Sequence, residues 1–335
     1  MKRSRRNPLI GKDEPQLGLF DEPGDDPVLE VASERDALSV LANRLPPSLR
    51  FGTSSWTFPG WAGLVYHRRY PSQRAFLRES LEEYAAHPLM RTVGIDRSYY
   101  APIPEADLAL YAAQLPESFK CAMKVWQRVT MPVYPRHPRY GADAGRSNPD
   151  FLNPDLFRAE VFDPVQRTLG RAMGPFILEI APSPVALDPD WFVEKLSRFL
   201  AAVPRELPIS VELRDRNLLT TGYVQTLRDH AAGHVFNYWS RMPSLAKQMG
   251  VDGLLVGSVC VVRLLLPPGA KYADLKEAYA PFDRIVEPQP AMRRDVAQLV
   301  EAALSRQMEV YVLVNNKAEG SSPLTVRALA QALAR

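Results

Sequence analysis

Polar and charged residues stand at the same end of nearly every short apolar run of this chain. They also share one side of each run, because alternate residues of a strand share a face. The set comprises Thr53, Ser55, Asp96, Ser98, Lys124, Glu179, Glu212, Arg214, Asn237, Arg263 and Asn315. Lys124, Arg214 and Arg263 would hold an anionic or hydroxylated ligand, because burying a charge without a partner is costly. Either Glu179 or Glu212 would exchange protons with that ligand.

The same side chains allow three other interpretations. A closed network of ion pairs would stabilise the barrel without binding a ligand. Lys124 could form a Schiff base if neighbouring cations lower its pKa. Magnesium or manganese could be held by Asp96, Glu179 and Glu212, whereas zinc is disfavoured because none of the five histidines ends a strand. The sequence assigns no cofactor.

The elements that must position these residues alternate between strand and helix about eight times, as in a (β/α)8 TIM barrel, where active sites lie at the C-terminal strand ends. The predicted strands span residues 49–54, 91–98, 119–125, 175–181, 208–214, 233–238, 259–265 and 309–315. The predicted helices span residues 72–86, 104–114, 154–172, 189–202, 218–231, 290–306 and 323–334. The predicted fold class is therefore α/β, with a TIM-barrel domain over residues 48–335.

Residues 1–47 are predicted to form a flexible tail, because they are rich in charged residues and proline and poor in apolar ones. A short helix at 34–45 could pack on the barrel through Leu38, Leu41 and Leu45.

The tail contains QLGLF at residues 16–20. This segment looks like the peptide by which bacterial DNA polymerases and repair enzymes bind the sliding clamp. Its side chains would fill a surface pocket of the clamp, and the alternative is a segment that docks on its own barrel. The anchoring residues would be Gln16, Leu17, Leu19 and Phe20.

Aromatic residues follow the first three predicted strands, namely Trp56, Tyr99 and Trp126. They could stack on sugar rings or bases, or they could only cover the barrel. A long connection follows Trp126, and residues 126–146 interleave arginine with tyrosine, which suits contacts with nucleic acid, although a solvated loop is the alternative. A second long connection, 267–289, follows the seventh strand.

Composition excludes several classes of protein. Hydrophobic residues make up 46% of the 335 residues, enough for one large core, and a net charge of +3 calls for no polyanionic partner. Cys121 and Cys260 fall inside apolar runs, which indicates reduced thiols and a cytoplasmic protein. No apolar stretch is long enough to span a membrane, and no secretory signal is found.

The assembled motifs resemble the YecE-like family, a domain of unknown function (number 72) with a barrel fold and a loose relation to sugar-isomerase-type barrels. They run in register over about residues 49–334. The matching segments are GTSSWTFPGW, VYHRRYP, VGIDRSYYAPIP, LPESFKCAMKVWQRVT, GPFILEIAPSP, ISVELRDRN, VVRLLLPPGAKY and VYVLVNNKAEGSSPLTVRAL. The resemblance implies the fold and supplies no reaction.

The chain departs from the family's pattern at several strand ends. The family's V-E-I-N-x-T-F-Y reads VGIDRSYY at 93–100, and its strand-four Gln is Glu179. Its I-T-H ends in Met131, its R-L-H-G reads RLLL at 263–266, and its F-N-N-D ends in Lys317. Replacement of two histidines and an aspartate weakens any metal or proton-transfer role that they carry in the family. The retained residues are Lys124, Glu212, Arg214, Arg263 and Asn315.

Three functional hypotheses follow. The first is an enzyme acting on a small anionic or sugar-like ligand at the C-terminal strand ends. The second is a protein of DNA repair or replication recruited through QLGLF, and the third is a non-enzymatic ligand-binding module. For the first, the catalytic candidates are Lys124, Glu212, Glu179 and Asp96, and the ligand-binding candidates are Arg214, Arg263, Asn237, Asn315, Trp56, Tyr99 and Trp126.

Overall fold

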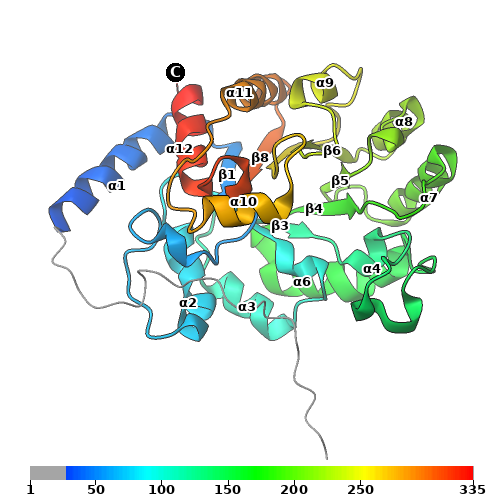
Figure 1. The fold of residues 1–335 in the computed structure, drawn as a ribbon, viewed down its shortest axis with the longest axis horizontal. Helices are drawn as coiled ribbons and strands as arrows, with labels where there is room; N and C mark the ends of the chain where they lie inside the picture. Colours follow the sequence, from blue (N-terminus) through cyan, green and yellow to red (C-terminus); the bar gives the residue numbers. More distant parts are fainter. Residues whose placement is uncertain (1–27, 335) are drawn as a thin grey trace, which may run out of the picture.

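Eight parallel strands form a nearly closed barrel in the computed structural model, which describes residues 28–334 (Figure 1). The strands are β1 (Leu49–Thr53), β2 (Thr92–Ile95), β3 (Lys120–Lys124), β4 (Met173–Ile180), β5 (Ile209–Leu213), β6 (Gly233–Tyr238), β7 (Val259–Leu264) and β8 (Glu309–Val314). Their order in the sheet is β1-β8-β7-β6-β5-β4-β3-β2. The predicted (β/α)8 TIM barrel is confirmed.

The barrel closes between β1 and β2, where pairing is short. Phe51 and Met90 form an isolated parallel bridge, and the Arg91 N–H donates to the Phe51 carbonyl oxygen at 2.9 Å. Gly52 permits this approach, because a Cβ at that position would lie only 2.0 Å from the Thr92 carbonyl oxygen.

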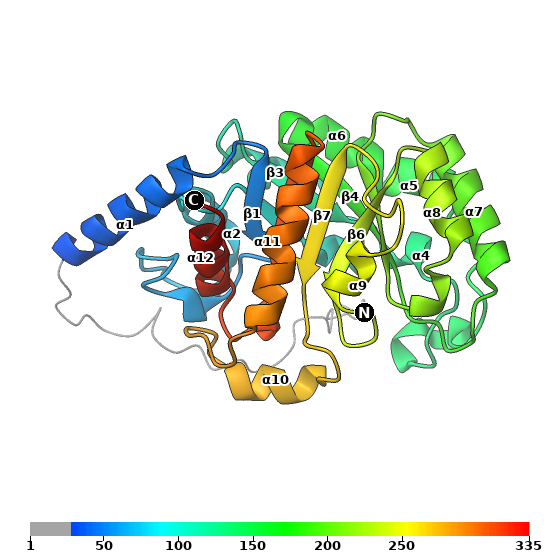
Figure 2. The same cartoon turned by 90° about the horizontal axis from the view of Figure 1, so that it is seen from above.

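Helices surround the strands, as Figures 1 and 2 show. They are α1 (Val28–Asn43), α2 (Gln73–Ala85), α3 (Glu105–Ala113), α4 (Gln127–Thr130), α5 (Pro154–Phe157), α6 (Asp163–Leu169), α7 (Pro189–Ala202), α8 (Thr221–Asp229), α9 (Leu245–Met249), α10 (Tyr272–Tyr279), α11 (Pro290–Ser305) and α12 (Ser322–Leu333). None of those within residues 28–334 combines the length and apolar character needed to cross a bilayer.

Helix α1 contains most of the short helix predicted at 34–45, but it begins earlier, at Val28. Leu38 and Leu45 are buried against the core. An ion pair of 2.6 Å between Glu34 and Arg327 joins α1 to α12. The segment just before β1 is thus held on the outside of the barrel.

Alternate residues of the strands divide between two apolar layers. One layer, which includes Phe51, Phe176 and Val211, lies between the strands and the helices. The other fills the barrel interior and includes Ala122, Ile177, Val235, Val261 and Leu313. Each interior residue is followed two positions later by a polar residue on the same face, so the polar ring lies at the C-terminal side of an apolar plug.

The helical structure differs from the prediction in two places. The helix expected over 154–172 is divided into α5, a π-helical turn (Arg158–Phe162) and α6, because Pro164 has no N–H to donate to the preceding turn. The connection 267–289 contains α10, whose one buried residue, Tyr279, leaves almost no apolar periodicity to recognise. Figure 2 shows α10 beyond the arrowhead of β7, at the C-terminal end of the barrel.

Candidate functional site

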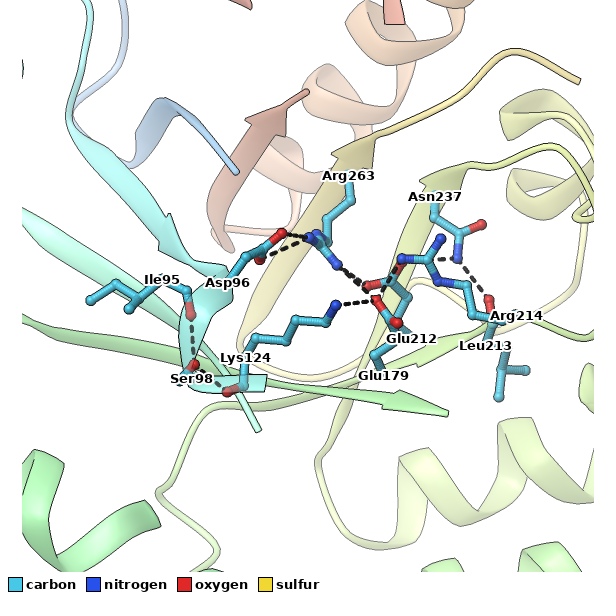
Figure 3. Close-up of polar contacts among 10 residues, drawn as sticks. All are labelled: Ile95, Asp96, Ser98, Lys124, Glu179, Glu212, Leu213, Arg214, Asn237 and Arg263. Atoms are coloured by element: carbon cyan, nitrogen blue, oxygen red, sulfur yellow. Dashed lines mark hydrogen bonds and ion pairs between the residues drawn. The ribbon is translucent and has the colours of Figure 1, made fainter. Parts of the chain in front are cut away.

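Six charged side chains converge at the C-terminal end of the barrel interior (Figure 3). We call them the charged cluster: Asp96, Lys124, Glu179, Glu212, Arg214 and Arg263. Three are acidic and three basic, so the formal charge of the cluster is zero. All six were predicted from strand alternation to lie together.

The register of the sheet places two carboxylates side by side. Glu179 on β4 is the direct partner of Glu212 on β5. Their repulsion is offset because each of two guanidinium groups bridges both carboxylates. Arg214 Nη2 lies 2.5 Å from Glu179 Oε2 and 2.8 Å from Glu212 Oε1. Arg263 Nη1 lies 3.3 Å from Glu179 Oε2 and 2.6 Å from Glu212 Oε2.

Arg263 also reaches across the barrel to Asp96, just after β2. Its Nη2 donates to Asp96 Oδ1 at 2.9 Å and to Oδ2 at 2.8 Å. Burial alone would lower the pKa of Arg263, but Asp96, Glu212 and Glu179 raise it above the ordinary value. Arg263 is therefore a permanent cation that joins β7 to β4, to β5 and to the turn after β2.

Glu179 accepts from three cations on a single oxygen, Oε2. The third is Lys124 Nζ, at 2.8 Å. Burial alone would raise the pKa of Glu179, but Arg214, Lys124 and Arg263 together hold it well below the ordinary value. Glu179 is therefore ionised at neutral pH, and its three ion pairs all use Oε2 and leave Oε1 out.

Two aromatic rings lie against the cations of the cluster. Lys124 Nζ lies 3.9 Å from the ring centroid of Tyr99, and the Arg214 guanidinium carbon lies 4.2 Å from that of Trp239. Each contact adds cation–π stabilisation to the ion pairs. Burial, followed by the charge of Glu179, raises the pKa of Tyr99, which is therefore neutral.

Exposure separates the carboxylates into two kinds. Glu212 is 0% exposed, and Glu179 is 7% exposed. The side chain of Asp96 is 31% exposed. Glu212 therefore orients Arg214 and Arg263 without meeting a ligand itself, while Glu179 and Asp96 can meet one.

A cavity of about 470 Å³ opens beside Arg214, at the ends of β4, β5 and β6. We call it the Arg214 cavity. Its lining consists of Pro182, Ser183, Arg214, Asp215, Arg216, Asn217, Ser240, Arg241 and Met242. The lining is largely polar, and its volume falls in the range of small-molecule sites, about 300–1,000 Å³.

Asn237, on β6, is held in place by a network of hydrogen bonds with β5 and with Gln248. Its Nδ2 donates to the Leu213 carbonyl oxygen at 2.8 Å and approaches Glu212 Oε1 at 3.5 Å. Gln248 Nε2 donates to the Asn237 carbonyl oxygen at 2.9 Å. His234 contacts Gln248 and Tyr223, and burial lowers the pKa of His234 to about 4. His234 is thus a neutral structural residue.

The prediction that Thr53, on β1, belongs to the set of polar residues inside the barrel is wrong. Thr53 faces the helices, where its hydroxyl lies 2.8 Å from the Tyr84 hydroxyl, and alternation gives the interior to Gly52 and Ser54. Asn315 follows β8, but its side chain accepts from the Lys317 N–H at 3.1 Å and caps a short 3-10 turn.

Two predicted aromatic residues lie apart from the charged cluster. Trp56 is buried, with its ring edge-on to Tyr111 at 5.1 Å. Trp126 is half-buried, and the Arg128 guanidinium carbon lies 5.8 Å from its ring centroid. The structure places neither ring against the cluster.

Several residues at the C-terminal end of the barrel were not predicted from the sequence to belong to the site. Trp239, Arg216 and Arg241 lie one to three residues past the ends of β5 and β6. The available signal was their place directly after predicted strands, because loops at C-terminal strand ends carry the functional residues of barrels.

No three His, Cys, Asp or Glu side chains within residues 28–334 come together as a metal site. Asp96, Glu179 and Glu212 are each bound by guanidinium or ammonium groups of the chain itself. Their donor set therefore fits internal ion pairing better than the magnesium or manganese hypothesis.

The segment QLGLF at 16–20 lies outside the described residues. The basic loop over 126–146 lies after β3 and carries four exposed arginines, Arg128, Arg136, Arg139 and Arg146. Its tyrosines Tyr134 and Tyr140 have ring centroids 5.5 Å apart.

Fold and site together define a TIM-barrel protein with a charged pocket at its C-terminal strand ends. The chain belongs to the family described as protein of unknown function DUF72, whose model matches residues 50–335. No curated protein matches the sequence.

Solved structures of DUF72 family proteins share the fold. The protein from Enterococcus faecalis is 16% identical with a TM-score of 0.56, and the match covers 85% of this chain and 95% of that one. The protein from Thermotoga maritima is also 16% identical, with a TM-score of 0.55 and coverage of 86% and 99%. The IolI protein with a bound zinc atom is more distant, at 12% identity and a TM-score of 0.45, with coverage of 85% and 96%.

Proposed function

We propose that this protein is an enzyme that binds a small anionic, sugar-like ligand at the C-terminal end of the barrel. The observation that carries the proposal is that Arg214 belongs both to the charged cluster and to the wall of an open polar cavity. A ligand anion in the cavity would therefore lie next to ionisable groups that can exchange protons.

The cluster supplies a mechanism by which the ligand would activate Glu179. With three cations around it, Glu179 is ionised but weakly basic, because its pKa is held low. An anion that pairs with Arg214 would weaken one of these interactions and raise the pKa of Glu179. Glu179 would then accept a proton from a ligand hydroxyl, and Lys124 would stabilise the charge that develops.

Native mass spectrometry of the purified protein tests ligand binding. We expect a small molecule to remain bound to the wild-type protein and to be lost from Arg214→Met. Circular dichroism would confirm that the variant folds, and Arg205→Met, on an exposed arginine before β5, is the matched control. A wild-type protein without bound ligand, and with no response to a panel of sugars, sugar acids and sugar phosphates, would refute the proposal.

Turnover is tested separately with Glu179→Gln, which keeps the shape of the side chain and removes its charge. Wild-type protein should convert the ligand, as followed by proton NMR, while Glu179→Gln should bind it without conversion. Binding without conversion by the wild-type protein would instead establish a non-enzymatic binding module.

The exposed basic loop supports a second candidate, contact with nucleic acid. Arg136 and Arg146 make no ion pair within residues 28–334, and the Tyr134 and Tyr140 rings lie close by. Anisotropy of a labelled oligonucleotide should show salt-dependent binding that Arg136→Ser with Arg146→Ser weakens. Equal binding by this double variant and by Arg205→Ser would reject the loop as the contact.

A further inference from the structure

The donors that line the Arg214 cavity point to a more specific ligand. We infer that this cavity binds the phosphate group of a phosphorylated small molecule. The inference rests on the proposed function and identifies the anionic end of its ligand.

The cavity presents cations from two loops and neutral donors from three. Arg214 and Arg216 follow β5, and Arg241 follows β6. The neutral donors are Ser183, Ser240 and Asn217. A phosphate dianion has several acceptor oxygens in a tetrahedral arrangement, so it suits donors that come from different directions.

One acidic residue, Asp215, also lines the cavity. Its Oδ1 accepts the backbone N–H of Asn217 at 2.9 Å, which directs the carboxylate into its own turn. Arg214 is already balanced by Glu179 and Glu212, so the other charged lining residues, Arg216, Arg241 and Asp215, leave a formal charge of +1. This charge remains favourable for an anion.

Two of the arginines have no acidic partner among the residues that the structure describes. Arg216 and Arg241 are exposed, and within residues 28–334 no carboxylate lies within 4.0 Å of either guanidinium. Arg214 is paired, but its ion pairs with Glu179 and Glu212 use only Nη2. Arg216 and Arg241 therefore line the cavity with guanidinium groups that no carboxylate of residues 28–334 pairs with.

The position of the cavity differs from the usual phosphate site of barrels, which lies after strands seven and eight. In this chain α10 covers that sector, and Lys317 lies there 4.2 Å from the ring centroid of Tyr272 and 5.4 Å from that of Phe282. Lys317 is only 4% exposed. The exposed cations of the cavity, Arg216 and Arg241, lie instead after β5 and β6.

Isothermal titration calorimetry with ribose 5-phosphate, ribose and inorganic phosphate as probes tests the inference. We expect both phosphate-containing probes to bind more tightly than ribose, with affinity that falls as salt rises. Arg216→Ala and Arg241→Ala should each weaken ribose 5-phosphate binding about tenfold. Both side chains are exposed and make no ion pair within residues 28–334, so the variants should fold. Arg205→Ala, at the opposite end of the barrel, should bind like the wild type.

Two results would overturn the inference, and neither is the result that refutes the proposed function. One is equal affinity for ribose and ribose 5-phosphate, unchanged in Arg216→Ala and Arg241→Ala, which would place the ligand elsewhere in the mouth. The other is no binding of either phosphate-containing probe at millimolar concentration while native mass spectrometry still detects a bound molecule.

Discussion

Replacing Glu212 by Gln tests whether its buried carboxylate holds the charged cluster together. Glu212 is fully buried and pairs with Arg263 at 2.6 Å and with Arg214 at 2.8 Å. Gln keeps the shape but leaves three cations facing two carboxylates, and its amide N–H groups meet guanidinium donors. Removing one partner of a buried ion pair costs about 3–5 kcal/mol, so we expect a loss of that size in the free energy of unfolding.

Asp96→Asn is the matched variant. Asp96 also pairs with Arg263, through two oxygens at 2.9 and 2.8 Å, but its side chain is 31% exposed. Water screens this pair, so the expected loss is about 1 kcal/mol or less. Both carboxylates share Arg263, so the difference between the variants reports the deeper burial of Glu212 together with its additional ion pair with Arg214.

Equilibrium unfolding in urea, followed by both circular dichroism and tryptophan fluorescence, measures the two losses. Coincident curves from the two probes are required for a single free energy of unfolding. Equal losses in the two variants would refute the reasoning, as would a Glu212→Gln protein as stable as the wild type.

Three further predictions concern the rest of the chain. Burial lowers the pKa of His234 to about 4, so the unfolded state binds more protons between that value and about 6.5. Stability should therefore fall as the pH drops through this window, by up to about 1.4 kcal/mol per pH unit, and His234→Gln should flatten the slope of the urea midpoints. Gly52→Ala should cost about 3 kcal/mol, because its Cβ would lie 2.0 Å from a backbone oxygen, while Gly222→Ala on α8, whose nearest contact would be 3.7 Å, should not destabilise the fold in the same assay. A labelled peptide containing residues 16–20 should bind a bacterial sliding clamp by anisotropy and lose binding when Leu19 and Phe20 become Ala; no binding by the unchanged peptide at high micromolar clamp would reject the motif.

The alternation of apolar and charged residues along the strands predicted much of the site. A charged residue is costly to bury among apolar side chains, so the alternation indicates which face of each strand carries the polar residues. In β4 and β5, Glu179 and Glu212 stand two residues after Ile177 and Ser210, on the same face of their strands. Only one assignment of the two faces therefore places the wholly apolar face against the helices. The first strand lacks this contrast, because Gly52 has no side chain. The polar residue Thr53 was therefore assigned to the interior face, but its hydroxyl lies within hydrogen-bond distance of the Tyr84 hydroxyl outside the barrel.

The cavity could not be predicted in the same way. Arg216 and Arg241 lie in loops, where no periodicity fixes the direction of a side chain, and Asn315 shows how a local turn can capture a polar group. Helix α10 was missed because its helical residues bury one side chain alone. Sequence patterns therefore identified the interior of the barrel better than its mouth.

Charge balance explains why the site needs both the charged cluster and the Arg214 cavity. The charged cluster has three acids and three bases, so it offers an incoming anion no net attraction. Attraction must come from cations outside that balance, and Arg216 and Arg241 are such cations beside the same cavity. Binding and proton transfer would then be divided between the loops and the strands. Arg216→Ala and Arg241→Ala should therefore raise KM with little change in kcat, while Glu179→Gln should lower kcat with little change in affinity.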